Sequence, residues 1–274
     1  MDTIEAIKSR ISTRVYHDEK LDEETLNKAR SAIALEKPFT LDSKHKMILV
    51  EDQELSKSLF MGIMGNYGKI VSAGCCIAGI TDDARESWIS VGFAQEIAVI
   101  ELTKLGLSTC WVGGFFHKSK VKEVFGAKEN EVVPNLISIG HTKPHFINTS
   151  IRSLVKGNRR KPKEEIAFHN EWGNNCLNFL ESNKDIDLAV QMSILSPSAS
   201  NRQPVRVIVS EKTAHFYIVD NNDLYSKMRL LDAGIFMSHF FMTMEHLDLK
   251  PETSFEKEYP LCGTGFAYAG SIKI

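Results

Sequence analysis

The sequence has few of the patterns that mark metal sites. Its five cysteines include no CxxC pair, and none is spaced from a histidine as zinc ligands usually are. The nine histidines are scattered, and Glu245-His246 does not extend into the HExxH motif of zinc enzymes. We therefore expect no metal site.

The sequence also lacks a long apolar run. A membrane-spanning helix needs about 20 consecutive apolar residues. The richest apolar segment, residues 93–107, is interrupted by Gln95, Glu96, Glu101 and Lys104. The N-terminal sequence MDTIEAIKSR is charged and has no apolar core of a secretory signal. We expect no membrane partner and a cytoplasmic location.

Neither sign of charge is in excess. The chain has 33 Lys and Arg against 35 Asp and Glu, which gives a net charge of -2 and a pI of about 6.5. A nucleic-acid partner is therefore not expected. The single basic run contains Lys156, Arg159, Arg160, Lys161 and Lys163. Taken by itself, such a short run is typical of a solvated loop.

The composition does provide material for a core. Of the 274 residues, 43% are hydrophobic and 25% are charged. These proportions are typical of a folded globular protein, and the length suits one large domain or two ordinary ones.

Helices and strands are predicted to alternate in the first half. Asp22 is placed to cap a helix whose first turn holds Glu23 and Glu24. Residues 46–50 and 75–80 predict strands, and the second should bury Cys75 and Cys76 as small hydrophobes.

A long helix is predicted next, with Phe93 and Ile97 on its apolar face. Gly106 stands in the position of a C′ glycine that ends such a helix. The sequence NLISIG at 135–140 then predicts a strand.

The second half repeats this order. It predicts a helix at 187–195, strands at 205–210 and 215–220, a long apolar helix at 232–249 and a terminal strand at 265–274. Gly92 matches Gly234 and Leu107 matches Leu249, each 142 positions later. This ordered self-similarity indicates duplication of one unit. We expect a first repeat at 1–155, a connecting segment at 156–184 and a shorter second repeat at 185–274, which together form one integrated unit. Trp172 indicates that part of the connecting segment packs.

Three residues near the N-terminus could bind an anion. In RISTRVY, the side chains of Arg10, Ser12 and Arg14 alternate along an extended segment and so point the same way. Guanidinium groups offer a planar pair of donors that suits a phosphate. The pattern alone is common, and a solvated helix end would explain it equally well.

A second polar motif, SPSASNRQP, lies in the other half of the chain. Its serine, asparagine and glutamine side chains can donate and accept hydrogen bonds at a ring edge or at hydroxyl groups. Pro197 and Pro204 restrict the loop between the predicted helix and strand. As a structural feature alone, it would be a polar helix–strand connection.

Together the two motifs resemble the flavin-binding signatures of the nitroreductase family, and the resemblance covers nearly the whole chain. It is strongest to an internally duplicated subgroup in which one chain mimics the family homodimer. The implied fold is α+β, a nitroreductase-like fold with two related α+β halves fused as a pseudo-dimer. The long helices of such a dimer share a core, which suits the apolar residues Phe236, Phe240, Phe241, Met242 and Met244.

The resemblance assigns a role to each motif. It implies that Arg10 and Ser12 hold the phosphate of FMN. It places Arg14 at the pyrimidine edge of the ring, where a positive charge stabilises the negative charge left by reduction. The loop residues it carries over to the flavin are Pro197, Ser198, Ser200, Asn201 and Gln203. Each signature occurs once, in opposite halves, so we expect one flavin site per chain.

Two further segments enter the expected site by the same resemblance. Val112, Gly113 and Gly114, in STCWVGGFF, occupy the place of the loop that points a backbone amide at flavin N5. Arg160, in NRRKP, matches a basic residue of the phosphate site. Asn66 stays open as a ring contact, because its region does not align securely. Cys110 lies beside the glycine loop, but no base is spaced to activate it as a nucleophile.

The chain departs from the family pattern at four positions. Ile11 replaces an arginine, Tyr16 a phenylalanine and Val205 a tryptophan, and Gly113 stands where some relatives carry a carboxylate. The expected function is FMN-dependent transfer of electrons from NAD(P)H to a small-molecule acceptor, a nitroaromatic or a quinone, by a ping-pong mechanism. No catalytic side chain is assigned, because the flavin carries the chemistry.

Several points stay open at this level. A protein electron donor is possible in place of NAD(P)H, and the pseudo-dimer could pair further. The alternative function is a flavin-binding sensor or storage protein with little turnover, which the departures at Val205 and Gly113 favour slightly.

Overall fold

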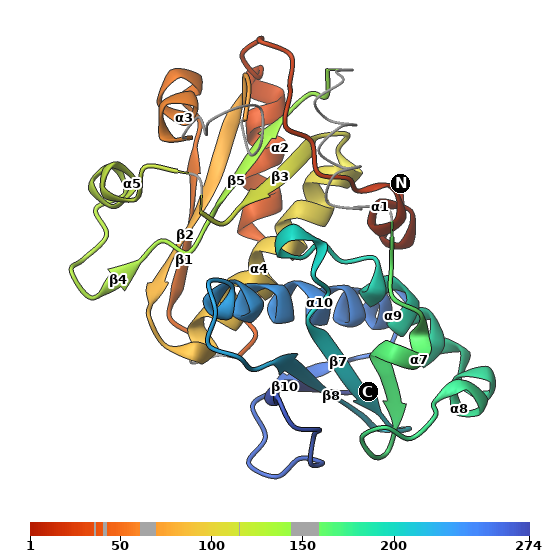
Figure 1. Cartoon of the computed structure of the whole chain (residues 1–274). Helices are drawn as coiled ribbons and strands as arrows, with labels where there is room; N and C mark the ends of the chain where they lie inside the picture. Colours follow the sequence, from red (N-terminus) through yellow and green to blue (C-terminus); the bar gives the residue numbers. More distant parts are fainter. Residues whose placement is uncertain (36, 41–42, 61–69, 115, 144–158) are drawn as a thin grey trace.

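Two sheets lie on either side of a central pair of long helices, α4 (Arg85–Lys104) and α10 (Ser226–His246), in the computed structural model (Figure 1). The structure describes residues 1–35, 37–40, 43–60, 70–114, 116–143 and 159–274. Within these ranges, no helix has the length and apolar character needed to cross a membrane.

The first sheet is antiparallel and belongs to the first half of the chain. Its strand order is β1-β2-β5-β3, and β4 pairs with the end of β2. The strands are β1 (His45–Val50), β2 (Cys75–Asp82), β3 (Ser108–Val112), β4 (Glu131–Val132) and β5 (Leu136–Gly140). Trp111 of β3 lies opposite Ile137 of β5.

The second sheet has the order β6-β7-β8-β10-β9. Its strands are β6 (Ala167–His169), β7 (Val205–Val209), β8 (Thr213–Val219), β9 (Glu252–Ser254) and β10 (Phe266–Lys273). Only β6 is parallel to its neighbour, β7. Because β6 comes from the segment that joins the halves, this connection contributes a strand to the second sheet.

The two sheets are wound in the same way. In each half, two adjacent strands are followed by the long helix, then by an edge strand, and then by a strand that inserts between. β1, β2, β3 and β5 thus occupy the positions of β7, β8, β9 and β10. The chain has an α+β fold of two related halves, as predicted.

The long helices cross at two glycines related by the 142-residue offset. A Cβ atom on Gly92 would clash with the backbone carbonyl of Leu231, and one on Gly234 would clash with the carbonyl of Ile89. Leu231 itself lies 142 positions after Ile89. Each helix thus offers the same pair of positions to the other, which is the pattern of contacts across a two-fold interface.

The main core spans both halves. It joins Ile89, Phe93 and Ile97 of α4 to Phe236 and Phe240 of α10. All five residues of the predicted Phe and Met stripe on α10 are buried, so that prediction is confirmed. Trp172 also packs as predicted, against Phe168 and Phe266 at ring distances of 4.9 and 4.6 Å.

The remaining helices surround this core. They are α1 (Thr3–Ser9), α2 (Glu23–Ala34), α3 (Gln53–Leu59), α5 (Lys118–Val124), α7 (Lys163–Ile166), α8 (Leu177–Ser182) and α9 (Lys184–Ile194). The Asp22 side chain accepts a hydrogen bond from the backbone N–H of Thr25 at 2.8 Å and so caps α2. Gly106 follows α4 with φ of +80°, as a C′ glycine does.

Two features differ from the sequence prediction. Both long helices begin earlier than their apolar patterns, α4 at Arg85 and α10 at Ser226, because their polar first turns carry no hydrophobic periodicity. Residues 108–112 also form a strand, β3, where the sequence predicts a loop. The strand is hard to predict because only five residues separate Leu107 from the glycines.

Candidate functional site

The RISTRVY segment runs along the edge of β3. Ser12 pairs with Thr109 in a parallel bridge, and the Thr13 amide donates to the Thr109 carbonyl at 2.9 Å. The buried Tyr16 hydroxyl donates to the carbonyl of Thr13 at 2.5 Å and lies 2.8 Å from the Ser138 hydroxyl. Tyr16 therefore links the RISTRVY segment to β5 through these two contacts. Because Thr13 is buried, Ser12 and Arg14 have the opposite orientation along the chain.

The three predicted anion-binding residues all act on one buried thiol, that of Cys110 on β3. Burial raises the pKa of the Cys110 thiol, while the charges of Arg14 and Arg10 and a hydrogen bond with Ser12 oppose that rise. Arg10, Ser12 and Arg14 thus influence the same thiol, whereas Ile11 between them is 43% exposed. A thiol with a raised pKa is a poor nucleophile, which argues against the nucleophilic alternative for Cys110.

Arg10 itself is almost completely buried. Its side chain is 5% exposed and forms an ion pair with the carboxylate of Glu96, whose Oε1 lies 3.7 Å from the Arg10 Nε. That distance is too long for a hydrogen bond. Within the described part of the chain, neither Nε nor Nη1 of Arg10 has a hydrogen-bond partner. A buried guanidinium with unused donors is suited to an anionic ligand.

Glu96 is at the centre of a buried cluster between the halves. Its Oε2 accepts from the indole of Trp111 at 2.7 Å, and its Oε1 lies 2.9 Å from Nε2 of His239 on α10. Nδ1 of His239 lies 3.0 Å from the carbonyl of Met192 on α9. In the sequence, Glu96 is only an interruption of an apolar run, and no motif singles out His239.

The SPSASNRQP loop is a tight turn with an unusual backbone. It contains a short 3-10 turn, η1 (Ala199–Asn201), and positive φ angles at Ser200, Asn201 and Gln203. Ser198 closes the turn, because its Oγ accepts from the Gln203 amide at 2.9 Å. Such backbone angles cost energy for non-glycine residues and occur often at ligand sites.

The loop directly contacts the NRRKP segment. Nη1 of Arg160 donates to Oδ1 of Asn201 at 2.9 Å, and Nη2 donates to the Leu195 carbonyl at 3.1 Å. Oε1 of Gln203 accepts from the Lys161 amide at 2.8 Å. Two segments that the family resemblance assigns separately to the expected site are therefore adjacent. In this structure the Asn201 and Gln203 amides hold the basic segment in place.

Asp232 anchors the same loop to α10. Its carboxyl group accepts from the Ala199 amide at 3.0 and 3.2 Å and is buried. Burial raises the pKa of Asp232 to about 7, and this rise is opposed by the Ala199 hydrogen bond and the charge of Arg229. No motif in the sequence points to a function for Asp232, which only opens the apolar pattern of the helix.

The glycine loop after β3 approaches the first turns of α10. A Cβ atom on Gly113 would clash with the Met228 sulfur, whereas the space beside Gly114 is open. Val112 is buried at the end of β3. One turn before Met228, the Tyr225 ring lies 3.9 Å from the Arg202 guanidinium, and its hydroxyl lies 3.4 Å from that of Ser200.

Helix α10 therefore connects the predicted pieces of the site. The glycine loop meets it at Met228, the SPSASNRQP loop at Tyr225 and Asp232, and Arg10 reaches it through Glu96 at His239. His239 lies eleven positions after Met228, which is about 16.5 Å of helix at roughly 1.5 Å per residue. Asn66 lies outside the described residues.

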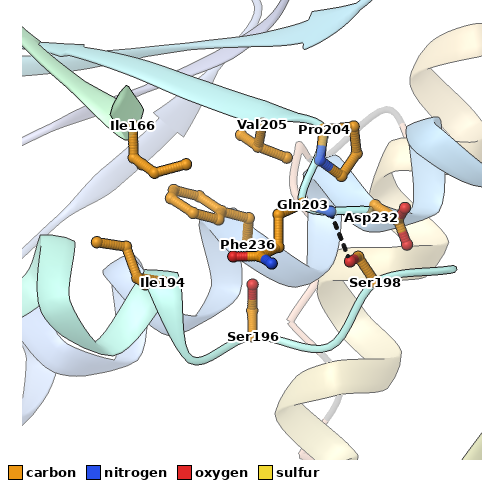
Figure 2. A pocket seen from close by; sticks show the side chains of 9 residues that line it. All are labelled: Ile166, Ile194, Ser196, Ser198, Gln203, Pro204, Val205, Asp232 and Phe236. Carbon is orange, nitrogen blue, oxygen red and sulfur yellow. Dashed lines mark hydrogen bonds between the residues drawn. The ribbon is translucent and has the colours of Figure 1, made fainter. Parts of the chain in front are cut away.

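A small cavity lies behind the SPSASNRQP loop (Figure 2). Gln203, Ser198 and Asp232 line one part of it, and Ile166 and Phe236 line another. Its volume of ≈ 10 Å³ suits one water molecule and is too small for a cofactor. Among the described residues, no group of three His, Cys, Asp or Glu side chains is arranged to hold a metal ion.

Comparison with known proteins gives consistent relatives. A family model described as "Putative TM nitroreductase" matches residues 2–244. A curated protein of Archaeoglobus fulgidus, named "Putative NADH dehydrogenase/NAD(P)H nitroreductase", is 24% identical over 151 residues, which are 52% of this chain and 86% of that protein.

A solved structure, described as a "putative nitroreductase" from Thermotoga maritima, is similar over the full chain. It is 21% identical, has a TM-score of 0.62, and is matched over 100% of this chain and 93% of its own. Because one solved chain covers both halves, the shared fold includes their fusion.

Proposed function

The chain belongs to the TM nitroreductase family, and from this premise we propose that it is an FMN-dependent oxidoreductase of small electron acceptors. Membership makes it an oxidoreductase. The proposal adds the cofactor FMN, NAD(P)H as electron donor, and a nitroaromatic or quinone as acceptor. The name of the Archaeoglobus relative supports a nicotinamide donor.

The proposal rests mainly on the Arg10 side chain, which is buried and incompletely hydrogen-bonded. The positively charged side chain of Arg10 is 5% exposed and has two nitrogens that make no hydrogen bond in the described structure, and its segment also carries Ser12 and Arg14. Burying a charge without full pairing is costly, so such a group is expected where a ligand completes it. A phosphate fits this donor set.

The other residues have complementary roles in the proposed site. Ser12 would add a hydroxyl to the phosphate, and Arg14 a fixed positive charge at the ring edge. The loop residues Pro197, Ser198, Ser200, Asn201 and Gln203 would border the ring and the ribityl chain, and Arg160 would add charge from the neighbouring segment. Val112, Gly113 and Gly114 would bring backbone amides close to the ring, for which the open space at Gly114 leaves room.

FMN, when bound, supplies the electron-transfer chemistry. The chain's own residues anchor the phosphate, hold polar groups at the ring edge and shape the pocket in which donor and acceptor bind in turn. This alternation gives the proposed ping-pong kinetics. We assign no side chain to a catalytic step.

The proposed origin of the site is a duplication. The two sheets share one strand order, and the helix crossing repeats at an offset of 142 residues. We propose that 1–155 and 185–274 descend from one unit, joined by 156–184. The chain would then act as a monomer that replaces the family dimer, with each signature retained in only one half.

An anaerobic flavin assay tests the function. The FMN-loaded protein is mixed with NADPH and, separately, NADH, and its flavin absorbance is followed. We expect bleaching by at least one donor and recovery on addition of a quinone. Binding of FMN without either change would indicate the sensor or storage alternative. Failure to bind FMN at all would overturn the proposal.

A further inference from the structure

The inference concerns the buried pair of Glu96 and His239. Glu96 lies on α4 and His239 on α10, and both side chains are 0% exposed. The His239 Nε2 lies 2.9 Å from Oε1 of Glu96, and its Nδ1 lies 3.0 Å from the Met192 carbonyl. Both nitrogens of one imidazole ring therefore face oxygen atoms at hydrogen-bond distance.

The donor count of this arrangement requires one additional proton. A carbonyl oxygen and an ionised carboxylate only accept hydrogen bonds, and a neutral imidazole donates from only one nitrogen. Both contacts are satisfied if His239 is an imidazolium beside an ionised Glu96, or if a protonated Glu96 donates to a neutral His239. We infer that Glu96 and His239 share a proton, which leaves the pair with no net charge.

This shared proton determines how much charge Arg10 retains. Without the shared proton, the ionised Glu96 would neutralise the nearby guanidinium, because charges interact strongly where water is excluded. With the shared proton, the three side chains together carry one positive charge. Glu96 is also engaged by closer donors than Arg10, since its Oε2 accepts from Trp111 at 2.7 Å, against 3.7 Å between Oε1 and the Arg10 Nε.

We therefore assign Glu96 and His239 as positioning residues that keep Arg10 available for an anion. This step rests on the proposed function, in which Arg10 binds the FMN phosphate. The pair also joins the halves, because Glu96 belongs to the helix of the first repeat and His239 to that of the second. Phosphate affinity would thus depend on a residue from each half.

The proton itself is measured by NMR of the full-length protein. The imidazole ¹⁵N and carboxyl ¹³C shifts of His239 and Glu96, assigned by comparison with the single variants, report where the protons lie. We expect either two protonated ring nitrogens or a protonated Glu96. A singly protonated His239 together with an ionised Glu96 would overturn the inference, whether or not the protein binds FMN.

The consequence is measured by titrating FMN and riboflavin into three variants. His239→Gln removes the proton but leaves the Glu96 carboxylate, so FMN affinity should fall about tenfold or more, the loss expected for a weakened charge-assisted contact. The affinity for riboflavin, which lacks the phosphate, should change little. Glu96→Gln should retain FMN affinity, and Glu96→Gln combined with His239→Gln should restore most of what His239→Gln loses.

A purely structural role gives a different pattern. The affinities for FMN and riboflavin would then fall equally, and the double variant would recover none of the lost FMN affinity. That result would overturn the inference. His215→Gln is the matched control, because this histidine contacts Ser271 in the second sheet, and it should leave both affinities unchanged. If wild-type protein binds riboflavin and FMN equally, the proposed phosphate site fails, while the NMR result still decides the protonation of the pair.

Discussion

Arg10 combines two properties that rarely occur together, a permanent charge and near-complete burial. Its side chain is 5% exposed, and its contact with Glu96 is an ion pair at 3.7 Å and not a hydrogen bond. A structural arginine usually has its donors used by carbonyls or carboxylates. Arg229 on α10, whose side chain is also 5% exposed, is an example, since it donates to the Asn221 carbonyl and forms an ion pair with Asp223.

Replacing Arg10 should separate binding of the phosphate from binding of the ring. Arg10→Ala is expected to weaken FMN binding by roughly 10–150-fold, since a charge-assisted hydrogen bond is worth about 1.5–3 kcal/mol. The affinity for riboflavin should fall much less. The measurement is fluorescence titration of both flavins. Arg30→Ala, on the more exposed face of α2, is the control and should affect neither. Equal weakening of both flavins would show that Arg10 acts through the fold.

Asp232 is a second buried ionisable residue with a measurable consequence. Its pKa is raised from 3.8 to about 7 by burial. A carboxyl group that holds its proton more tightly in the folded state makes the folded state less stable as pH rises between the two pKa values. The destabilisation is therefore absent below about pH 4 and complete above about pH 7.

Asp232→Asn should remove this pH dependence. The amide oxygen can still accept from the Ala199 amide but carries no charge. The stability of the variant relative to wild type should rise between pH 4 and pH 8 by a few kcal/mol at most, since each pKa unit is worth about 1.4 kcal/mol. Urea unfolding across this range measures it, with exposed Asp220→Asn as control. A difference between variant and wild type that is constant with pH would contradict the prediction.

At the scale of elements, the crossing of α4 and α10 depends on two glycines. Each lies against a backbone carbonyl of the other helix, so there is no room for a side chain at either position. This close approach lets Phe93 and Phe241 of opposite helices meet at a ring distance of 5.4 Å. The halves consequently share one core, and neither half buries its long helix alone.

Gly234→Ala should force the two helices apart. Because the added methyl group meets backbone and not a flexible side chain, we expect destabilisation at or above the usual 1–3 kcal/mol of an overpacked core. Gly92→Ala should do the same. Gly114→Ala, where the space is open, is the control and should leave the melting temperature nearly unchanged. Tolerance of alanine at both crossing positions would show that the helices do not approach so closely.

At the scale of the molecule, the two halves have similar topology but different surface chemistry. The arginine-rich segment follows α1 in the first half, and the SPSASNRQP loop follows α9 in the second. The corresponding positions, before α9 and after α2, carry neither motif. The symmetry of the fold would therefore yield one flavin site and not two.

Flavin stoichiometry tests this asymmetry. A fully loaded sample is expected to contain one FMN per chain, because only one combination of the two halves carries both signatures. Absorbance of the released flavin against protein concentration measures the ratio, and the Arg10→Ala variant supplies the background. Two equivalents of FMN per chain would contradict the split site.

Much of the fold could be predicted from residues that act locally. Asp22 caps α2 and Gly106 terminates α4 because each acts within one turn of its own helix. The strand at 108–112 was missed because it is short and adjoins a helix and a glycine loop. The early starts of α4 and α10 were missed because their first turns are polar and lack a side-chain cap.

For the site, the sequence supplied the motifs but not their mutual arrangement. The family signature identified Arg10, Ser12, Arg14 and the SPSASNRQP loop by residue type and order alone. It gave no signal for Glu96, Asp232 or His239, since isolated polar residues in apolar helices have many explanations. Their contacts become visible only when Glu96 and His239, 143 positions apart, lie 2.9 Å from each other.

The sequence by itself thus determined the local elements, the repeated order of the halves and the residues that carry the flavin signatures. The tertiary structure decided that Arg10 is buried beside a Glu96–His239 pair and that the Asn201 and Gln203 amides hold the basic segment. The physical reason is the distance along the chain over which each effect acts. Caps, turns and hydrophobic periodicity act over a few residues, whereas the environment of a buried charge depends on groups that the chain brings together only by folding.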